Sequence, residues 1–404
     1  MKKVSLGILS LLVGSLLMAC GGGAAPSAAP SSTAPSAAPA SSTAPAPASA
    51  PASKPASSGA ASVTASSAAL ASAKPAASAS TAAPAAASGA AKPAASGQAT
   101  AITLALGYIP NIQFAPFYVA QAKGFYKDQG IDISFDNGTS PDLIKAVGAG
   151  KFKFAIADPD TVVSAREQSI PVTYVGALYA QAPVAIISLP KAGISQPADL
   201  KGKKVGLPGR FGSSYIGLLG VLNKVGLTEK DVDLQEIGFN QPPQLLAGKV
   251  DAVVGYANND AIQVQAQAGT KPNVILISDV IPFIGTGLVV NDDTMKGSDQ
   301  LTQGMVKAML LGMQYSAAHP DEAFQITTKV VPEAGGANAK VNQDVLAASI
   351  PLWKDKGTAA NGLGYTDPAS WKAMEDVMAK AGIIKTEPPV DQVMTNKYIS
   401  QDVK

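Results

Sequence analysis

The side chains best suited to recognise a small molecule follow short apolar runs of the sequence. Ligands of α/β proteins bind beyond the carboxyl ends of strands, so residues just after each expected strand are the candidates. The candidate binding residues of this kind are Tyr108, Asn111, Phe114, Asp158, Asp160, Tyr179, Gln181, Tyr215, Tyr256, Asn258 and Asn259. Aromatic faces fix the plane of a flat heterocycle, and amides pair with its edge. The pattern predicts a heteroaromatic ligand; for each single ring, the alternative is that it closes the core.

A glycine-rich turn, Gly206–Tyr215 (GLPGRFGSSY), joins an expected strand to an expected helix. Free backbone N–H groups and the helix dipole favour an anion or a carbonyl oxygen at such a turn. Arg210, Ser213 and Ser214 are therefore further candidate binding residues. A sulfonate or phosphate would use all of these donors, whereas a neutral ring system needs one or two. The alternative is that Ser213 or Ser214 only caps the helix.

Cysteine and histidine each occur once, as Cys20 and His319. This excludes intramolecular disulfides, Cys/His zinc sites, iron–sulfur clusters and a Cys–His protease. The sequence contains no GxSxG, HExxH or Walker-type motif. His319 precedes Pro320 at the end of a helical run, so we expect it at a helix terminus or on the surface. We expect no catalytic residue, no metal and no cofactor.

The chain after position 100 alternates short apolar runs with stretches of helical spacing, which is typical of an α/β protein with mainly parallel sheets. Strands are predicted at 102–108, 131–136, 154–158, 172–179, 184–189, 204–207, 232–237, 250–256, 274–278 and 288–291. Helices are predicted at 115–129, 141–149, 161–168, 214–225, 244–248 and 259–268. From 298 onward the pattern is helical, with a break at 357–364 and with Trp353 and Trp371 as packing anchors.

Ten strands followed by a helical tail favour two lobes over one long sheet. A second series of strands and helices begins after the strand at 184–189 and ends with the strand at 288–291. We therefore assign residues 101–187 and 287–404 to lobe 1 and residues 188–286 to lobe 2. The two crossings between the lobes are hinge candidates, and the cleft between the lobes is the expected ligand site.

The first twenty residues have the features of a secretory leader. Lys2 and Lys3 precede an apolar run, Val4–Ala19, that is shorter than the roughly 20 residues a membrane-spanning helix needs. The run ends in Leu17–Cys20 (LMAC), which resembles the lipobox of bacterial lipoproteins. The resemblance implies that Cys20 becomes the N-terminus and carries lipid, including palmitate; an ordinary signal peptide that ends in a cysteine is the alternative.

Residues 21–100 contain no aromatic residue, no Asp and no Glu, and consist almost wholly of Ala, Ser, Pro, Gly and Thr. Such a segment lacks the apolar side chains whose burial must offset roughly 1–2 kcal/mol of backbone entropy per residue. We expect a disordered tether with a span of roughly 50 Å as a flexible coil. A spacer that serves only solubility or glycosylation is the alternative.

The net charge of +2 belongs to the leader and tether rather than to the folded part. The chain has 31 basic and 29 acidic residues, but five lysines precede position 101, which leaves the folded part at about −3. Nucleic-acid binding requires clustered Lys and Arg to neutralise phosphates. We therefore expect no nucleic-acid partner.

Three motifs resemble the solute-binding proteins related to thiamine-pyrimidine synthase, over roughly residues 101–385. The first comprises Leu106–Asn111 (LGYIPN), Phe117–Tyr126 (FYVAQAKGFY) and Gly130–Asp132, the second is Ile194–Gly206 (ISQPADLKGKKVG), and the third is Gly248–Asn259 (GKVDAVVGYANN). The resemblance implies a bilobed fold of the type II periplasmic-binding-protein class. It also implies a monomeric lipoprotein on the extracytoplasmic face of the membrane, which delivers a vitamin to an ABC permease and its ATPase.

The synthase in this family has a histidine three residues after its Asn and a cysteine-rich iron site, whereas Phe114 stands at that place here. The resemblance therefore favours a binding protein. Asp158, Asp160, Gln181, Asn258 and Asn259 could bind polyol hydroxyls or a uracil-like edge, which favours riboflavin. A thiamine pyrimidine precursor and, with less support, an alkanesulfonate are the alternatives.

Overall fold

The computed structural model describes residues 99–403. The predicted leader, the predicted lipidation site Cys20 and nearly all of the predicted tether lie outside the described residues. Within the described part, none of the helices is both long enough and apolar enough to cross a membrane.

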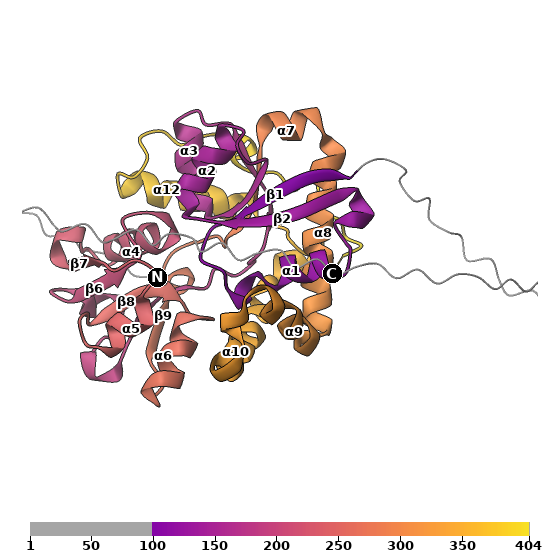
Figure 1. Ribbon diagram of the computed structural model, residues 1–404. Coiled ribbons are helices and arrows are strands. Elements are labelled where there is room, and N and C mark those ends of the chain that lie inside the picture. Colours follow the sequence, from indigo (N-terminus) through magenta and orange to yellow (C-terminus); the bar gives the residue numbers. More distant parts are fainter. Residues whose placement is uncertain (1–98, 404) are drawn as a thin grey trace, which may run out of the picture. The chain divides into compact units, whose positions relative to one another are not determined.

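Ten strands form two five-stranded sheets, as the sequence predicts (Figure 1). The first sheet has the order β2-β1-β3-β10-β4, and its strands are β1 (Thr100–Leu106), β2 (Ile131–Asn137), β3 (Phe154–Ala157), β4 (Val172–Ala177) and β10 (Gly287–Asn291). The second sheet has the order β7-β6-β8-β5-β9, and its strands are β5 (Val184–Ser188), β6 (Lys204–Leu207), β7 (Asp233–Glu236), β8 (Ala252–Tyr256) and β9 (Asn273–Leu276).

Each sheet contains one strand that runs against the others. β10 is antiparallel to β3 and β4, and β5 is antiparallel to β8 and β9, whereas β1 and β6 pair in parallel with their neighbours. β5 and β10 are the strands that directly follow the two crossings between the sheets. A strand that enters a sheet at the edge where its parallel strands end must run back through it, so the crossings account for the antiparallel strands.

One predicted boundary is wrong in its position. The sequence divides the lobes between residues 187 and 188, but the whole of β5, from Val184 to Ser188, pairs with β8 and β9 in the second sheet. The first crossing is therefore the segment 178–183, between β4 and β5, and the second is the segment 277–286, between β9 and β10. A continuous apolar run does not reveal which of two sheets will bury it.

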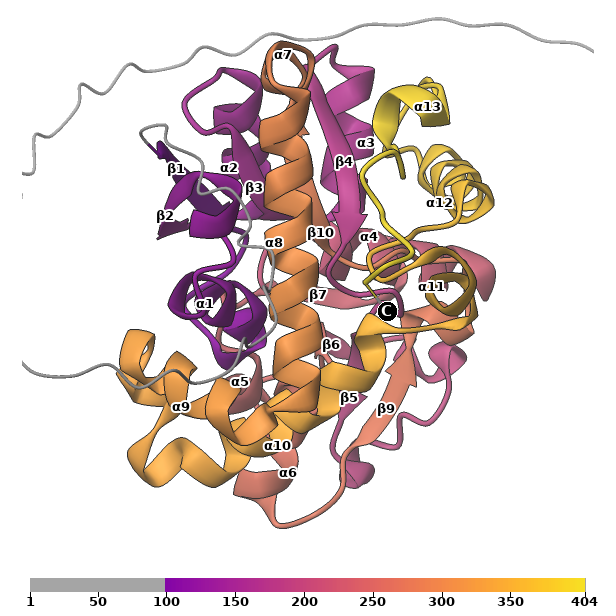
Figure 2. The same cartoon turned by 90° about the vertical axis from the view of Figure 1, so that its right-hand side faces the viewer.

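Helices cover both faces of each sheet. The helices are α1 (Ala115–Ala122), α2 (Ser140–Gly148), α3 (Pro159–Glu167), α4 (Gly212–Lys224), α5 (Gln241–Leu246), α6 (Asp260–Ala268), α7 (Asp292–Gly297), α8 (Asp299–Ala318), α9 (Pro320–Val330), α10 (Ala339–Ser349), α11 (Lys356–Asn361), α12 (Pro368–Lys380) and α13 (Val390–Val393). Figure 2 shows the long helix α8 in front of the first sheet, with α1 beside it.

Alternation along the central strands sends neighbouring side chains to opposite layers. Leu104 and Leu106 of β1 pack in the cluster that contains α1 and α8, whereas Ala105 packs in the cluster that contains α2 and α3. The strands of a sheet covered on both faces are expected to read as continuous apolar runs, as this one does. In the second sheet, α4 lies on one face and α5 and α6 lie on the other.

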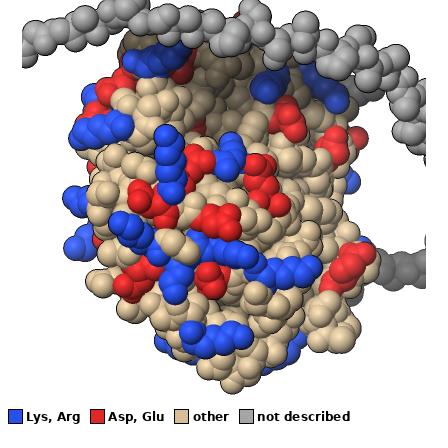
Figure 3. Space-filling view, turned by 90° about the vertical axis from the view of Figure 1, so that its left-hand side faces the viewer, with Lys and Arg blue, Asp and Glu red and all other residues tan. Residues whose placement is uncertain are grey.

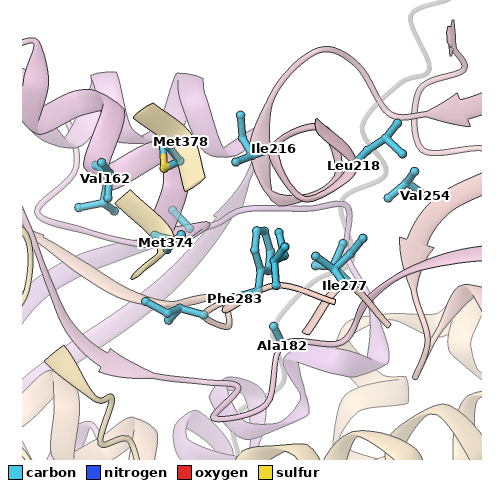
Figure 4. Close-up of a cluster of buried hydrophobic side chains, with 14 of the residues drawn as sticks. Val162, Ala182, Ile216, Leu218, Val254, Ile277, Phe283, Met374 and Met378 are labelled. Carbon is cyan, nitrogen blue, oxygen red and sulfur yellow. The ribbon is translucent and has the colours of Figure 1, made fainter. Parts of the chain in front are cut away.

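One apolar cluster is continuous from lobe to lobe. It joins Val162 of α3, Ile216 of α4, Phe283 of the second crossing, and Met374 and Met378 of α12 (Figure 4). Helix α12 packs against both α3 and α4. Helix α12 of the C-terminal tail therefore packs against both lobes.

Two helical regions, one in the tail and one at α1, have bounds that differ from the prediction. The break expected at 357–364 is occupied largely by α11, in which Asp355 caps the first turn by accepting a hydrogen bond from the backbone N–H of Thr358 at 2.7 Å. The helix expected at 115–129 ends at Ala122, and a separate 3₁₀ turn covers Lys127–Gln129. Trp353 and Trp371 are buried, which confirms them as packing anchors.

Helices α1 and α8 approach closely because Gly312 faces Pro116. A methyl group on Gly312 would lie 2.0 Å from the carbonyl oxygen of Pro116 and 3.0 Å from Cβ of Ala120. The first obstacle is backbone, which cannot rotate away as a side chain can. Only glycine fits this helix crossing without a shift of one helix.

We expect Gly312→Ala to lower the free energy of unfolding by about 1–3 kcal/mol, because overpacking shifts the two helices apart. Chemical denaturation measures the change. Gly297→Ala at the end of α7 is the control, since no atom lies within 4 Å of the added methyl group. Equal stability of the two variants would show that α1 and α8 are not in close contact.

Candidate functional site

A cavity lies between the two lobes, at the edges where their parallel strands end. The cavity has a volume of about 760 Å³, which includes its opening to solvent. Its lining residues lie near the ends of β3 and β8, in the segments that follow β1, β2, β3, β4, β6, β7 and β8, or just before β10. They are Gly107, Tyr108, Gln113, Phe114, Ser140, Ile156, Asp158, Leu178, Tyr179, Pro208, Phe211, Gly212, Ser213, Ser214, Phe239, Gln241, Tyr256, Asn259, Asp260 and Thr286.

Six aromatic rings from both lobes line this cavity. Tyr108 of the first lobe meets Phe239 of the second edge to face, with ring centroids 4.8 Å apart. Tyr179 and Tyr256 make a similar contact between the lobes at 6.3 Å. Edge-to-face pairs hold rings at steep angles to one another, which leaves faces available to a flat ligand.

Asp158 is the polar centre of the cavity. It stands immediately before α3, and its carboxylate accepts hydrogen bonds from Ser140 at 3.0 Å, from Thr286 at 3.1 Å and from Tyr256 at 3.4 Å. Tyr256 belongs to the second lobe, so this last contact joins the lobes. Burial raises the pKa of Asp158, and the hydrogen bonds from Ser140, Thr286 and Ser213 oppose the rise.

A second carboxylate, that of Asp160 in α3, lies against the N-terminus of α4. The hydroxyl of Ser213 donates a hydrogen bond to Asp160 at 2.8 Å, and Asp160 is 2% exposed. Gly212 has φ of +65°, and a methyl group on it would lie 2.7 Å from Oδ2 of Asp158. Both carboxylates therefore face the N-terminus of α4, whose dipole favours negative charge.

The surroundings of Asp160 disfavour its charged form despite these partners. Burial, followed by repulsion from Asp158, raises the pKa of Asp160 to about 8. Repulsion between two buried carboxylates favours a state in which the pair holds one proton, because ionising both in a buried site is costly. In the second lobe, burial raises the pKa of Asp260 to about 6, although the backbone N–H of Tyr256 donates to it at 2.7 Å.

Amide side chains form a third group around the hydroxyl of Tyr179. Gln113 donates to this hydroxyl at 3.1 Å, and Asn258 of the second lobe donates to it at 3.2 Å and to Ser349 of α10 at 2.7 Å. Burial raises the pKa of Tyr179, which keeps it neutral. Oδ1 of Asn258 and Oε1 of Gln241 are buried without a hydrogen-bond partner. Gln241 lines the cavity, so its oxygen is a ready acceptor for a ligand.

Most of the predicted site residues come together here. Tyr108, Phe114, Asp158, Tyr179, Ser213, Ser214, Tyr256 and Asn259 line the cavity. Asp160 and Asn258 lie directly behind the lining, bonded to Ser213 and Tyr179. Whether these side chains contact a ligand stays a prediction.

The four other predicted residues lie outside the cavity lining. Asn111 caps a 3₁₀ turn, Ile112–Phe114, by accepting from the N–H of Gln113 at 3.0 Å. Gln181 donates to the carbonyl of Lys354 at 2.7 Å. Arg210 pairs with Glu229 and Glu236, and the hydroxyl of Tyr215 donates to Glu229 at 2.8 Å. Except for Asn111, each of these side chains is held by a residue distant in the sequence, which its position after a strand does not reveal.

Sequence reasoning missed several lining residues. Thr286 precedes an antiparallel strand, so the rule of examining residues after strands could not find it. Gln113 and Ser140 stand at the beginnings of helical turns, and Gln241 begins α5. Phe239 lies three residues after the end of β7, and Asp260 directly follows Asn259, so the same rule could have included both.

His319 does not belong to the site. It stands between α8 and α9, is exposed, and packs its ring on Tyr315 with centroids 4.4 Å apart. This confirms the helix-terminal position predicted for it. On the face shown in Figure 3, acidic and basic side chains are interspersed.

Comparison with known proteins agrees with the fold. The family model described as NMT1/THI5 like matches residues 111–323. The chain is 37% identical to the riboflavin-binding protein RibY of Chloroflexus aurantiacus, over 74% of this chain and 86% of that protein. It is 26% identical to the formylaminopyrimidine-binding protein of Halalkalibacterium halodurans, over 67% of this chain and 82% of that protein.

Relatives with an enzyme name also match. The 4-amino-5-hydroxymethyl-2-methylpyrimidine phosphate synthase of Legionella pneumophila is 27% identical over 62% of this chain and 79% of that protein. Among solved structures, the alkanesulfonate-binding protein SsuA of Xanthomonas axonopodis superposes with a TM-score of 0.57 at 16% identity, and covers 76% of this chain and 100% of its own. The fold is that of periplasmic binding proteins, and the predicted bilobed architecture is confirmed.

The raised pKa of Asp160 gives a stability prediction. The folded protein binds this proton more tightly than the unfolded chain, so stability falls as pH rises from about 4 to the folded pKa of about 8. We expect Asp160→Asn to be more stable than the unmodified protein at pH 8, by on the order of 1 kcal/mol, with the advantage vanishing near pH 4. Thermal denaturation across this range measures it.

Asp132→Asn is the matched control, since Asp132 is an exposed residue of β2. An advantage of Asp160→Asn that does not change with pH would contradict the shared proton of Asp158 and Asp160.

Proposed function

Because the chain belongs to the NMT1/THI5-like family, we propose that it is the substrate-binding lipoprotein of an ABC importer and that its ligand is riboflavin. The observation that carries the proposal is the cavity between the lobes, in which six aromatic rings surround buried amide and carboxyl groups. A vitamin with a flat ring system would be held on both sides as the lobes close.

The polar groups suit the two ends of riboflavin. Its uracil-like edge carries one N–H donor between two carbonyl acceptors, which matches the free oxygen of Gln241 and the amide groups of Gln113 and Asn259. Its ribityl chain carries hydroxyl groups, for which Asp158 and Asp260 are acceptors. A relative with 37% identity bears the name riboflavin-binding protein, which supports this assignment.

A thiamine pyrimidine precursor is the second candidate. An aminopyrimidine presents a ring nitrogen and an amino group side by side, and a protonated carboxyl group pairs with both. Asp158 and Asp160, which share a proton, provide such a group. The relative named formylaminopyrimidine-binding protein supports this alternative.

We propose binding rather than turnover. The relatives include a synthase, but this sequence has one cysteine and one histidine, and the histidine is the exposed His319 between α8 and α9. Phe114 is buried beside the cavity at the place where the synthase motif has its histidine. A chain without that imidazole has no residue to replace it at the site.

Ligand capture would use the contacts that already join the lobes. Ser213 bonds Asp160, Tyr256 bonds Asp158, and Asn258 bonds Tyr179 across the cleft. A ligand can shift the lobes only through contacts that differ between the open and closed states. The ligand would replace some of these hydrogen bonds and add its own ring contacts, and the permease would read the resulting closed shape.

The anchor and location complete the proposal. Cys20 would hold the protein at the extracytoplasmic face of the membrane, and residues 21–100 would let the binding unit reach the permease. Solved structures with this fold include periplasmic sulfonate-binding and nitrate-binding proteins, which supports a position outside the cytoplasm.

Titration with riboflavin tests the ligand. We expect the full-length protein to quench riboflavin fluorescence at stoichiometric addition, and Tyr108→Ala to weaken binding about 10-fold or more, because a stacking face worth roughly 1 kcal/mol or more is lost. Tyr215→Ala removes a tyrosine that bonds Glu229 outside the cavity and is the control.

No quenching at micromolar ligand would reject riboflavin, and a calorimetric signal with the thiamine pyrimidine precursor would then support the second candidate. Equal loss in Tyr108→Ala and Tyr215→Ala, with both variants folded by circular dichroism, would reject this cavity as the site.

Lipid attachment is tested separately. We expect the mature protein, expressed in a bacterium with lipoprotein processing, to begin at Cys20 and to carry acyl chains visible in its mass spectrum. Cys20→Ser should abolish both features and move the protein from the detergent phase to the aqueous phase. An unmodified cysteine in the mature protein would support the ordinary signal peptide.

A further inference from the structure

The N-terminus of α4 has the build of an anion site, yet this protein fills it with its own carboxylates. A glycine-rich turn precedes the 13-residue helix, and free N–H groups and the dipole at such a terminus favour a phosphate or sulfonate. Here Asp158 and Asp160 of the first lobe occupy that position. Ser213 donates its hydroxyl to Asp160 at 2.8 Å, and Gly212 lies against Oδ2 of Asp158.

Gly212 is shaped for this contact. Its φ of +65° is a conformation that residues with side chains rarely adopt, and a methyl group would lie only 2.7 Å from the carboxylate oxygen. The close approach of backbone to carboxylate leaves no room for a second anionic group at the same helix terminus.

The rest of the cavity offers an anion no compensation. Among the described residues that line it there are two carboxylates, Asp158 and Asp260, and no lysine, arginine or histidine. Arg210, the cation of the glycine-rich turn, is paired with Glu229 and Glu236 outside the cavity. A ligand anion would meet the negative charge of Asp260 and that of the Asp158–Asp160 pair, which stays anionic while it holds a single proton.

We propose that Asp158 and Asp160 are specificity-determining residues that admit the neutral form of the ligand and reject its phosphate ester. The inference rests on the proposed function only in taking this cavity as the site of a heteroaromatic ligand. A phosphate monoester carries a charge of about −1.5 to −2 near neutral pH, and buried carboxylates in the same cavity repel it.

The same geometry predicts how the preference can be reversed. Asparagine has the shape of aspartate, accepts the hydrogen bond from Ser213 through its amide oxygen and carries no charge. The change leaves the N–H groups and the dipole of α4 without an anionic partner. A phosphate would then find the helix terminus that the carboxylates now occupy.

Paired titrations test the proposal. Riboflavin and riboflavin 5′-phosphate share their fluorescent ring, so quenching by the full-length protein compares them directly. We expect the unmodified protein to prefer riboflavin by about 100-fold or more, and the double variant Asp158→Asn/Asp160→Asn to reduce the preference by about 10-fold or more. Asp132→Asn removes an exposed charge from β2 and should leave the preference unchanged.

Equal affinity of the unmodified protein for the two flavins would overturn the proposal. So would a folded double variant, by circular dichroism, that keeps the full preference. Single variants at Asp158 and at Asp160 are measured too, so that one misfolded protein does not decide the result.

Failure of the riboflavin assignment is a separate outcome. If neither flavin binds, the same comparison uses 4-amino-5-hydroxymethyl-2-methylpyrimidine and its phosphate, followed by calorimetry. A preference for the neutral pyrimidine that the double variant loses would support the charge selection and reject riboflavin as the ligand. Absence of binding by both neutral compounds would reject the cavity as a heterocycle site and this proposal with it.

Discussion

The chain passes between its two sheets twice, through residues 178–183 and 277–286, and both passages lie where the parallel strands end. The strands that follow, β5 and β10, must therefore run against their neighbours. The turns after β1, β3, β6 and β8 face one another across the same gap. The cavity, its aromatic lining and its carboxylates are where they are because of this connectivity.

The two sides of the crossings differ in chemistry. Behind them, α12 and Phe283 belong to an apolar cluster that is continuous across both lobes, and such packing resists separation. In front of them, the lobes meet through hydrogen bonds such as those of Tyr256 with Asp158 and Asn258 with Tyr179. A ligand can exchange these hydrogen bonds for its own with little loss, whereas the apolar cluster stays intact. The apolar cluster and the hydrogen bonds therefore lie on different sides of the crossings.

The carboxylate pair of Asp158 and Asp160 is costly to bury, and it lies at the cavity between the lobes. Burial and mutual repulsion raise the pKa of Asp160, whereas the hydrogen bonds from Ser213 and Thr161 lower it, and the N-terminus of α4 also favours its charged form. Replacement by an apolar pair would avoid this penalty. The exclusion of anionic ligands that we propose would explain why buried carboxylates that weaken the fold lie at a position suited to an anion.

Local sequence patterns were sufficient to predict the ten strands of the described residues, the helices that separate them and many of the polar groups near the cavity. These follow from local patterns, since apolar periodicity reflects burial and strand ends in this fold class carry the binding groups. Tertiary structure decided which sheet buries β5, that Thr286 enters the site from the beginning of a strand, and that Arg210 and Tyr215 are held by Glu229. It also decided that the glycine-rich turn meets carboxylates rather than an open space. Such outcomes depend on partners far away in the chain. The spacing of residues along a sequence does not show which distant side chain will lie beside a given residue.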